Sequence, residues 1–418
     1  MIRVAPVLGF LFILAPAAAQ QVRVFGQADT EADVTPANEA GPLNPGNILN
    51  VPLFTDTSDL TVFGDVSADD KRWKLKVKLH ASGDWSSQSL YKFDVSELSF
   101  RYSVTSWLDL HVGREIEKWG TGYAWNPTGV LNPPKDPTDP NDRRSLYTGV
   151  NVAGADIFTK GWDITLLGVP QISWAGKDGR HLLSTGWAAR SYRLIKGTDV
   201  AFTASGGNGL PNSEGLSLAR VFGNSLELHA EAAYISDTIR YLPRWDGLVP
   251  DDLVPVRRPH SEILVGGQYT FPNRINVVAE YYHAGQGLSD REWNGYEAYA
   301  ATAQQNLLAG NPQSLMLANA QFTPLNMSKD YTFLRVLWPI LPNRLEIETI
   351  LVTSLRDGSS VVQPTLTKRV GTNWSVYLLY NHFLGGPATE FGNVQIGSST
   401  DIGIRYRFSL EGKTARSK

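Results

Sequence analysis

The side chains in this sequence that could take part in nucleophilic or acid–base chemistry do not form a catalytic pattern. A serine nucleophile needs a histidine that a third group orients, and the Gly-x-Ser-x-Gly turn that exposes such a serine is absent. His-Glu-x-x-His and a phosphate-binding glycine loop are absent too. The sequence therefore predicts no catalytic residue, no cofactor and no metal site. We interpret His111, His229 and His283 as hydrogen-bonding residues on an inward-facing wall.

Charged and apolar side chains alternate between residues 72 and 80. Arg72, Lys74, Lys76 and Lys78 are separated there by Trp, Leu and Val residues. Because successive side chains of a strand point to opposite faces, the cations share one face and the apolar residues share the other. Four cations facing lipid would cost roughly 8–16 kcal/mol, at about 2–4 kcal/mol each. The cationic face is therefore expected to border a wet interior.

The same alternation places other charged residues on the inward face of their segments. Basic residues are concentrated on the segment 72–80 and on the last segment, whereas the remaining positions are mainly acidic. Such walls would set the ion preference of a pore, or the charges would pair between neighbouring strands and hold the wall together. Both interpretations stay open. The further inward residues are Glu97, Arg101, Asp109, His111, Glu227, Glu231, Glu280, Arg405 and Arg407.

A proline-rich segment, residues 120–148, follows one of these strands and combines aromatic and charged side chains. Proline restricts the backbone, so the segment has little conformational freedom to lose on folding. We expect it to fold inward as a constriction rather than extend outward, because so long an irregular segment needs a surface to pack on. Its acids are interpreted as solvated rather than as calcium ligands. The constriction residues are Trp119, Tyr123, Trp125, Asp136, Asp139, Arg143 and Arg144.

Pairs of amphipathic segments joined by tight turns recur along the chain, and each segment is close to the ~9–11 residues of a tilted membrane strand. The connections between the pairs are long, at residues 117–148, 237–259, 285–329 and 385–399. Short turns at one end and long loops at the other are typical of a closed antiparallel transmembrane β-barrel. The count is about 18 strands, with 16 as the fallback, and it is even only if Val22–Ala28 is a strand. A short helix is expected within Tyr296–Leu308.

The composition is consistent with a barrel, and the two ends of the sequence predict where the barrel begins and ends. The 418 residues include 12 Trp, 16 Tyr, 16 Phe and 38 Gly but no Cys, with a net charge of −3. This balance suits hairpins ringed by aromatic residues, and the small charge gives no indication of a nucleic-acid partner. Residues 1–19 have the basic start, apolar run and Ala-x-Ala site of a signal peptide. We assign residues 20–408 to the barrel and residues 409–418 to a polar tail.

Several short motifs resemble those of a large, poorly characterised group of porin-like outer-membrane barrels. A strand ends in Gly113-Arg114, a Trp119-Gly120 pair follows, and Asn-Pro pairs occur at Asn126 and Asn132. The last strand is similar to the C-terminal assembly signal of such barrels. Further matches are Glu280-Tyr281-Tyr282-His283, Gly285, Gly287-Leu288, Asp357-Gly358-Ser359, Glu390-Phe391-Gly392, and Asp401, Gly403, Tyr406 and Phe408 in the last strand.

The resemblance implies a bacterial outer-membrane channel of general-porin or alginate-export-like architecture. It would pass small hydrophilic solutes by facilitated diffusion, contact outer-membrane lipid, and engage the barrel-assembly machinery through Asp401–Phe408. Two alternatives stay open at this point. One is an outer-membrane barrel enzyme of the lipase type, and the other is a secreted soluble β-protein that binds carbohydrate.

Overall fold

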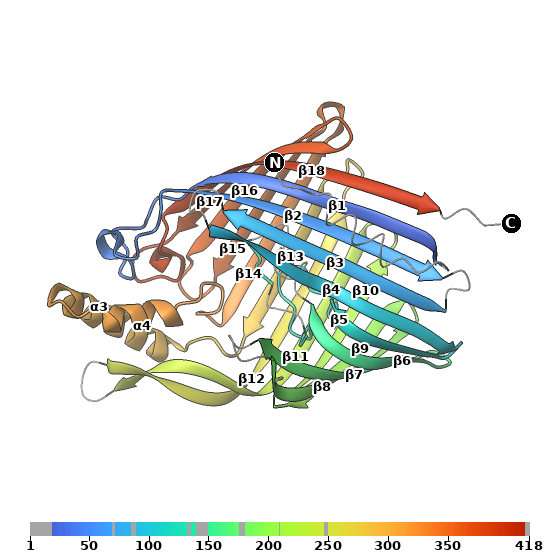
Figure 1. The fold of residues 1–418 in the computed structure, drawn as a ribbon. Helices are drawn as coiled ribbons and strands as arrows, with labels where there is room; N and C mark the ends of the chain where they lie inside the picture. The colour runs from blue at the N-terminus through green and yellow to red at the C-terminus, as the bar shows by residue number, and fades with distance from the viewer. Residues whose placement is uncertain are drawn as a thin grey trace.

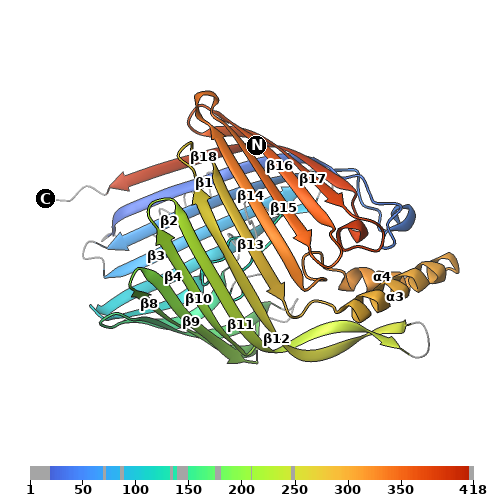
Figure 2. The same cartoon turned by 180° about the vertical axis from the view of Figure 1, so that it is seen from behind.

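The chain forms a closed barrel of 18 antiparallel strands, seen from two sides in Figures 1 and 2. The computed structural model describes residues 19–68, 72–84, 89–131, 135–138, 149–174, 180–208, 210–245 and 250–413. Each strand pairs with the next along the chain, and β1 pairs with both β2 and β18, which closes the ring. The predicted count of 18 is confirmed.

The strand bounds follow the alternating segments of the sequence. The first nine strands are β1 Ala19–Val34, β2 Phe54–Ala68, β3 Trp73–Asp84, β4 Ser89–Thr105, β5 Leu108–Glu115, β6 Val150–Phe158, β7 Asp163–Trp174, β8 Arg180–Ile195 and β9 Thr198–Gly207. The remaining strands are β10 Ser213–Phe222, β11 Leu226–Trp245, β12 Pro250–Thr270, β13 Asn276–Ala284, β14 Asp330–Ile340, β15 Leu345–Ser354, β16 Ser360–Val370, β17 Trp374–Leu384 and β18 Ser398–Lys413.

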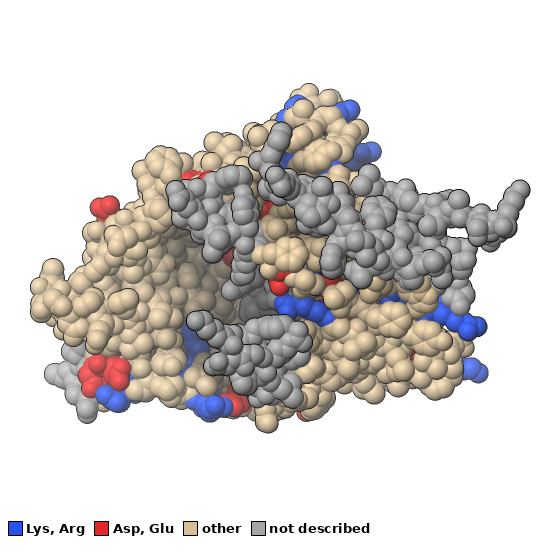
Figure 3. Space-filling view, in the orientation of Figure 1, with Lys and Arg blue, Asp and Glu red and all other residues tan. Residues whose placement is uncertain are grey.

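The two faces of the sheet have opposite chemistry, as the alternation predicts. Ile402 and Ile404 of β18 are 56% and 50% exposed on the outside. Arg405 of the same strand points to the other face and is buried. Residues opposite each other in register point to one side, so Tyr406 and Trp374 share the outer face. Much of the surface seen in Figure 3 accordingly carries neither acidic nor basic side chains. An apolar outside around a closed antiparallel ring is the arrangement that hydrocarbon requires.

Strands at three places extend beyond the segments that the sequence predicted. β1 continues to Val34. β18 runs past Phe408 to Lys413, where its residues pair with the start of β1. The connection 237–259 is a two-stranded ribbon, because β11 and β12 stay paired well beyond the barrel wall. Figure 1 shows this ribbon extending beside the helices.

The long connections gather at one end of the barrel, which we call the loop end, while the tight turns lie at the opposite turn end. At the loop end lie α3 Asp290–Leu308 and α4 Gln313–Gln321, with the short 3-10 helices η1 Pro45–Asn47 and η4 Phe391–Asn393. A third 3-10 helix, η3 Leu341–Asn343, forms a tight turn. The predicted helix lies within α3, which begins earlier at a capping box of Ser289 and Glu292. In the described part of the chain no helix is both long and apolar enough to cross a membrane.

Candidate functional site

Several of the basic residues predicted on the inner wall face an acidic or aromatic group. Lys76 Nζ is 3.5 Å from Glu97 Oε1. Lys78 Nζ lies 4.8 Å from the centre of the Phe63 ring. Arg72 precedes β3, and its carbonyl accepts a hydrogen bond from the N–H of Ser103. Lys74 lies opposite Arg101 in register on the same inward face.

The charged residues of the last strand and of β4 bond side chains of nearby strands. Arg405 Nε donates to Asp29 Oδ1 at 2.6 Å, and Arg407 Nε donates to Gln27 Oε1 at 3.0 Å. Arg101 pairs with Asp156 and lies 3.8 Å from Asp109. The interpretation in which charges pair across strands therefore describes this part of the wall.

Glu231 of β11 projects into the barrel and binds the segment that enters after β5, described at residues 116–131 and 135–138, which we call the inner loop. Its carboxylate accepts from the N–H of Thr121, from the N–H of Gly122 at 2.6 Å, and from the N–H and hydroxyl of Thr128 at 3.0 and 2.7 Å. Hydrogen bonds to an ionised acceptor are stronger than neutral ones. A side chain predicted to line an acidic wall thus holds a loop in the interior.

Glu280 of β13 provides a second attachment point two strands away. It accepts from the N–H of Tyr123 at 2.5 Å and of Ala124 at 2.8 Å. Its other neighbour is His229, whose Nε2 lies 2.7 Å from Oε1, while His229 Nδ1 lies 3.1 Å from Glu227. The two carboxylates Glu231 and Glu280 therefore bind consecutive parts of one loop.

Gly120 is required where the inner loop turns toward Glu231. Its φ of +90° lies in the region that favours glycine. A side chain there would also collide with Asn126 and approach the Glu231 carboxylate. Asn126 in turn donates to the carbonyl of Trp119 at 2.6 Å. The Trp-Gly pair singled out in the sequence is thus explained by a tight turn.

The tryptophans of the inner loop are anchors. Trp125 is 6% exposed and stacks on Tyr282 at 4.9 Å between ring centres, with Tyr331 and Phe333 also in contact. Trp119 is 3% exposed and packs with Val152 and Leu167. Both were predicted among the constriction residues, and the wall covers both of them. Tyr123, at 37%, stays accessible, with the Arg335 guanidinium 5.1 Å from its ring centre.

The inner loop crosses the interior and reaches the far wall. The amide of Gln363 on β16 donates to the carbonyl of Thr138. The hydroxyl of Thr138 donates to Asp136. Between this contact and the turn end lies a cavity of about 520 Å³. A second cavity, of about 260 Å³, lies against Trp125 and Lys135. The predicted residues Asp139, Arg143 and Arg144 lie outside the described residues.

The larger cavity is strongly polar. Arg335 pairs there with Glu348, and Arg369 lies 3.5 Å from Glu346. Tyr377 donates to Glu31 at 2.6 Å. The residues predicted to line the interior did not include Arg335, Gln363 or Tyr377. The two-residue period of β14, β16 and β17 would have placed all three inward.

His111 and Glu115 of β5 lie at the foot of the inner loop beside Glu117. His111 Nδ1 is 2.8 Å from Glu115 Oε2. Burial and the neighbouring Glu115 carboxylate raise the pKa of Glu117 to about 7. This cluster was not predicted from the sequence, where His111 was interpreted as a separate residue of the inward-facing wall. His283 was expected inward as well, and that was wrong. It shares the outer face with Tyr281 and lies 2.8 Å from Asp330.

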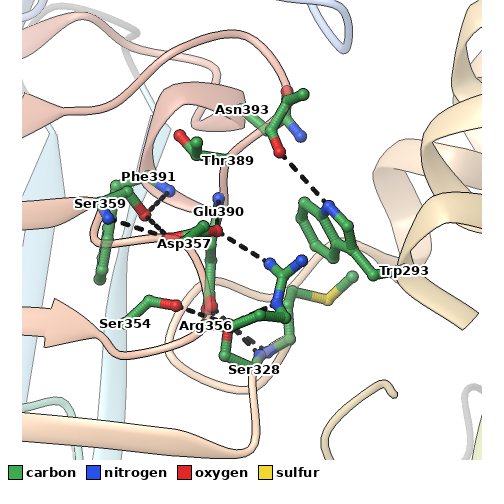
Figure 4. A network of polar contacts seen from close by, with 12 residues as sticks. Trp293, Ser328, Ser354, Arg356, Asp357, Ser359, Thr389, Glu390, Phe391 and Asn393 are labelled. Atoms are coloured by element: carbon green, nitrogen blue, oxygen red, sulfur yellow. Dashed lines mark hydrogen bonds and ion pairs between the residues drawn. The ribbon is translucent and has the colours of Figure 1, made fainter. Parts of the chain in front are cut away.

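A buried polar network fixes the loop end (Figure 4). Glu390 accepts from the N–H of Leu325 at 2.7 Å, from that of Ser328 at 3.1 Å and from the Tyr331 hydroxyl at 2.8 Å. The N–H of Glu390 donates to Asp357 at 2.9 Å. Burial raises the pKa of Glu390. Through its carboxylate and its backbone N–H, Glu390 therefore joins the loops before β14 and before β16 to its own loop before β18.

α3 is attached to the same network. The Trp293 indole donates to the carbonyl of Ala388 at 3.3 Å, and the Arg356 guanidinium lies 3.8 Å from the Trp293 ring centre. Glu297 accepts from the Asn393 amide at 2.5 Å. Burial raises the pKa of Glu297 to about 7. The helices are thus fixed to the barrel rim through side chains.

Comparison with solved structures identifies the same fold elsewhere. OccAB3 of Acinetobacter baumannii is similar with a TM-score of 0.55 at 10% identity, covering 94% of this chain and 99% of the other. Pseudomonas aeruginosa OccK11 (OpdR) gives 0.53 at 9% identity, over 94% and 96%. Pseudomonas aeruginosa OccK3 (OpdO) gives 0.53 at 10%, over 93% and 96%. No protein-family model and no curated protein matches the chain.

Proposed function

We propose that the protein is a bacterial outer-membrane channel through which small hydrophilic solutes diffuse, with the inner loop as its constriction. The observation that carries the proposal is the binding of this loop across the barrel interior by Glu231, Glu280 and Gln363. The loop that these side chains hold narrows the passage. It does not fill it, because a polar cavity remains between the loop and the turn end.

The walls of that cavity favour hydrophilic solutes. Arg335, Arg369, Arg405 and Arg407 line it together with Glu31, Glu346, Glu348 and Asp401. Charged and hydrogen-bonding groups of both signs would exchange with the hydration shell of a polar solute, whereas an apolar solute would gain nothing there. The outside of the barrel contacts lipid, and the loop end faces the exterior. We propose that β18 engages the barrel-assembly machinery, as its terminal aromatic residues indicate.

Transport is tested with the detergent-purified chain reconstituted into planar bilayers and into liposomes. The account predicts discrete current steps in salt solution and swelling of the liposomes in small sugars and amino acids at rates that fall with solute size. Current steps without any solute flux would limit the function to ions. A folded barrel that produces neither would rule out the channel.

A further inference from the structure

The foot of the inner loop brings three ligand-type side chains together. The donor atoms of His111, Glu115 and Glu117 all lie within 4.8 Å of one another. Two come from β5 and the third from the loop that leaves it. Tetrahedral zinc ligands lie roughly 3.3 Å apart when each bond is about 2.0–2.1 Å long. Small side-chain rotations would therefore bring the three atoms onto one ion.

Two features of the cluster suit a cation. The carboxylates of Glu115 and Glu117 lie close together, and a positive ion between two such groups would offset their mutual repulsion. The His111 side chain is fully buried, and its Nε2 has no hydrogen-bond partner among the described residues. Nδ1 is therefore the ring nitrogen that faces the Glu115 carboxylate, and Nε2 is left for a partner on the other side of the ring.

The remaining neighbour completes a familiar arrangement. Asp156 Oδ2 lies 3.9 Å from His111 Nε2. A histidine that binds a metal through one ring nitrogen usually directs the N–H of the other toward a carboxylate. Binding through Nδ1 would leave Nε2–H facing Asp156. Asp156 also forms an ion pair with Arg101. The acid beside the imidazole thus suits an orienting role.

We propose that His111, Glu115 and Glu117 bind a divalent transition-metal ion, with zinc as the preferred ion. One imidazole and two carboxylates match a three-ligand zinc site with an open position for water. Calcium and magnesium prefer sets made only of oxygen ligands. The ion joins the wall strand β5 to the inner loop two residues before the Trp119 anchor. Metal binding does not depend on the proposed channel function.

The test uses the full detergent-purified chain after chelator treatment. Zinc chloride is titrated by calorimetry, and cobalt chloride is followed by visible absorption, which reports a low-coordinate site. We expect one saturable site per chain. Affinity falls at least about tenfold in Glu117→Gln and in His111→Gln, because loss of a ligand costs no less than loss of an orienting partner.

His260→Gln is the matched control, since His260 is also buried and lies 3.2 Å from Glu262. It should leave zinc affinity unchanged. Because His111 is packed in the wall, Glu117→Gln on the loop is the decisive variant if His111→Gln does not fold. The absence of saturable zinc binding would overturn the proposal. So would a site that Glu117→Gln leaves intact, or one that His260→Gln weakens equally.

Discussion

Buried carboxylates in this barrel act mainly by accepting backbone N–H groups of loops. Glu231 and Glu280 do so inside the barrel, and Glu390 does so at the loop end. A buried charge is costly unless hydrogen bonds replace its hydration. The loops supply these bonds with N–H groups that would otherwise lack partners. Acid and loop therefore stabilise each other, and neither is expected to stay ordered without the other.

Glu231→Gln tests this dependence at a single residue. The amide replaces a charged acceptor by a neutral group whose NH₂ would face the loop donors. Each lost bond to a charged acceptor removes about 1.5–3 kcal/mol, so the inner loop should open more often. Hydrogen–deuterium exchange of residues 119–130 should rise, and single-channel currents should become noisier.

Glu97→Gln is the matched control for Glu231→Gln. It changes the interior charge by the same amount, and Glu97 lies on β4, where it pairs with Lys76 of the neighbouring strand β3. Equal exchange of the inner loop in the two variants would show that Glu231 does not hold it.

Residue positions on the wall could be predicted from the sequence, whereas residue partners could not. Alternation assigns Glu231, Glu280 and Arg405 to the inward face, because a strand has a fixed period of two. It did not indicate that loop amides would occupy the two glutamates, since that contact joins residues about a hundred or more positions apart. The same limit concealed the burial of Trp119 and Trp125.

At the scale of elements, the long connections of the barrel are folded structures. The inner loop packs on aromatic side chains of β13 and β14. α3 packs on the ribbon of β11 and β12, where Gly295 lies against Pro243 and Trp245. The ribbon contains prolines at positions 243, 250, 255 and 259. They are tolerated because the ribbon extends beyond the barrel wall, where edge positions need no ladder donor.

The contact between α3 and the rim is predicted to weaken as pH rises. Burial raises the pKa of Glu297 to about 7 from an ordinary value of 4.5. The bound helix therefore favours the protonated acid. This contribution is complete below pH 4.5, declines through pH 7 and is lost above it. Exchange of α3 amides, corrected for intrinsic rates, should be faster at pH 8 than at pH 5.

Glu297→Gln should remove this difference, because the amide cannot ionise and can still bond Asn393. Protection of α3 that is equal or greater at pH 8 in the unmodified chain would contradict the prediction.

For the whole molecule, the number of strands and their order followed from local signals. Tight turns of Gly, Asn and Pro punctuate segments of uniform length, and closure requires β1 to meet β18. The width of the passage could not be predicted in this way. It depends on how far the inner loop reaches across the ring, and Gln363 on β16 fixes that reach through a single contact with Thr138.

The most direct test of this account is the single-channel conductance of a chain in which residues 120–148 are replaced by a short Gly-Ser linker. The linker joins Trp119 to Gly149, and Gly149 lies beside the Glu115 carbonyl at the end of β5. Folding of the variant is verified by heat-modifiable migration in gels. If the inner loop constricts a water-filled barrel, the conductance rises severalfold above that of the unmodified chain. A folded variant whose conductance is unchanged would contradict the account.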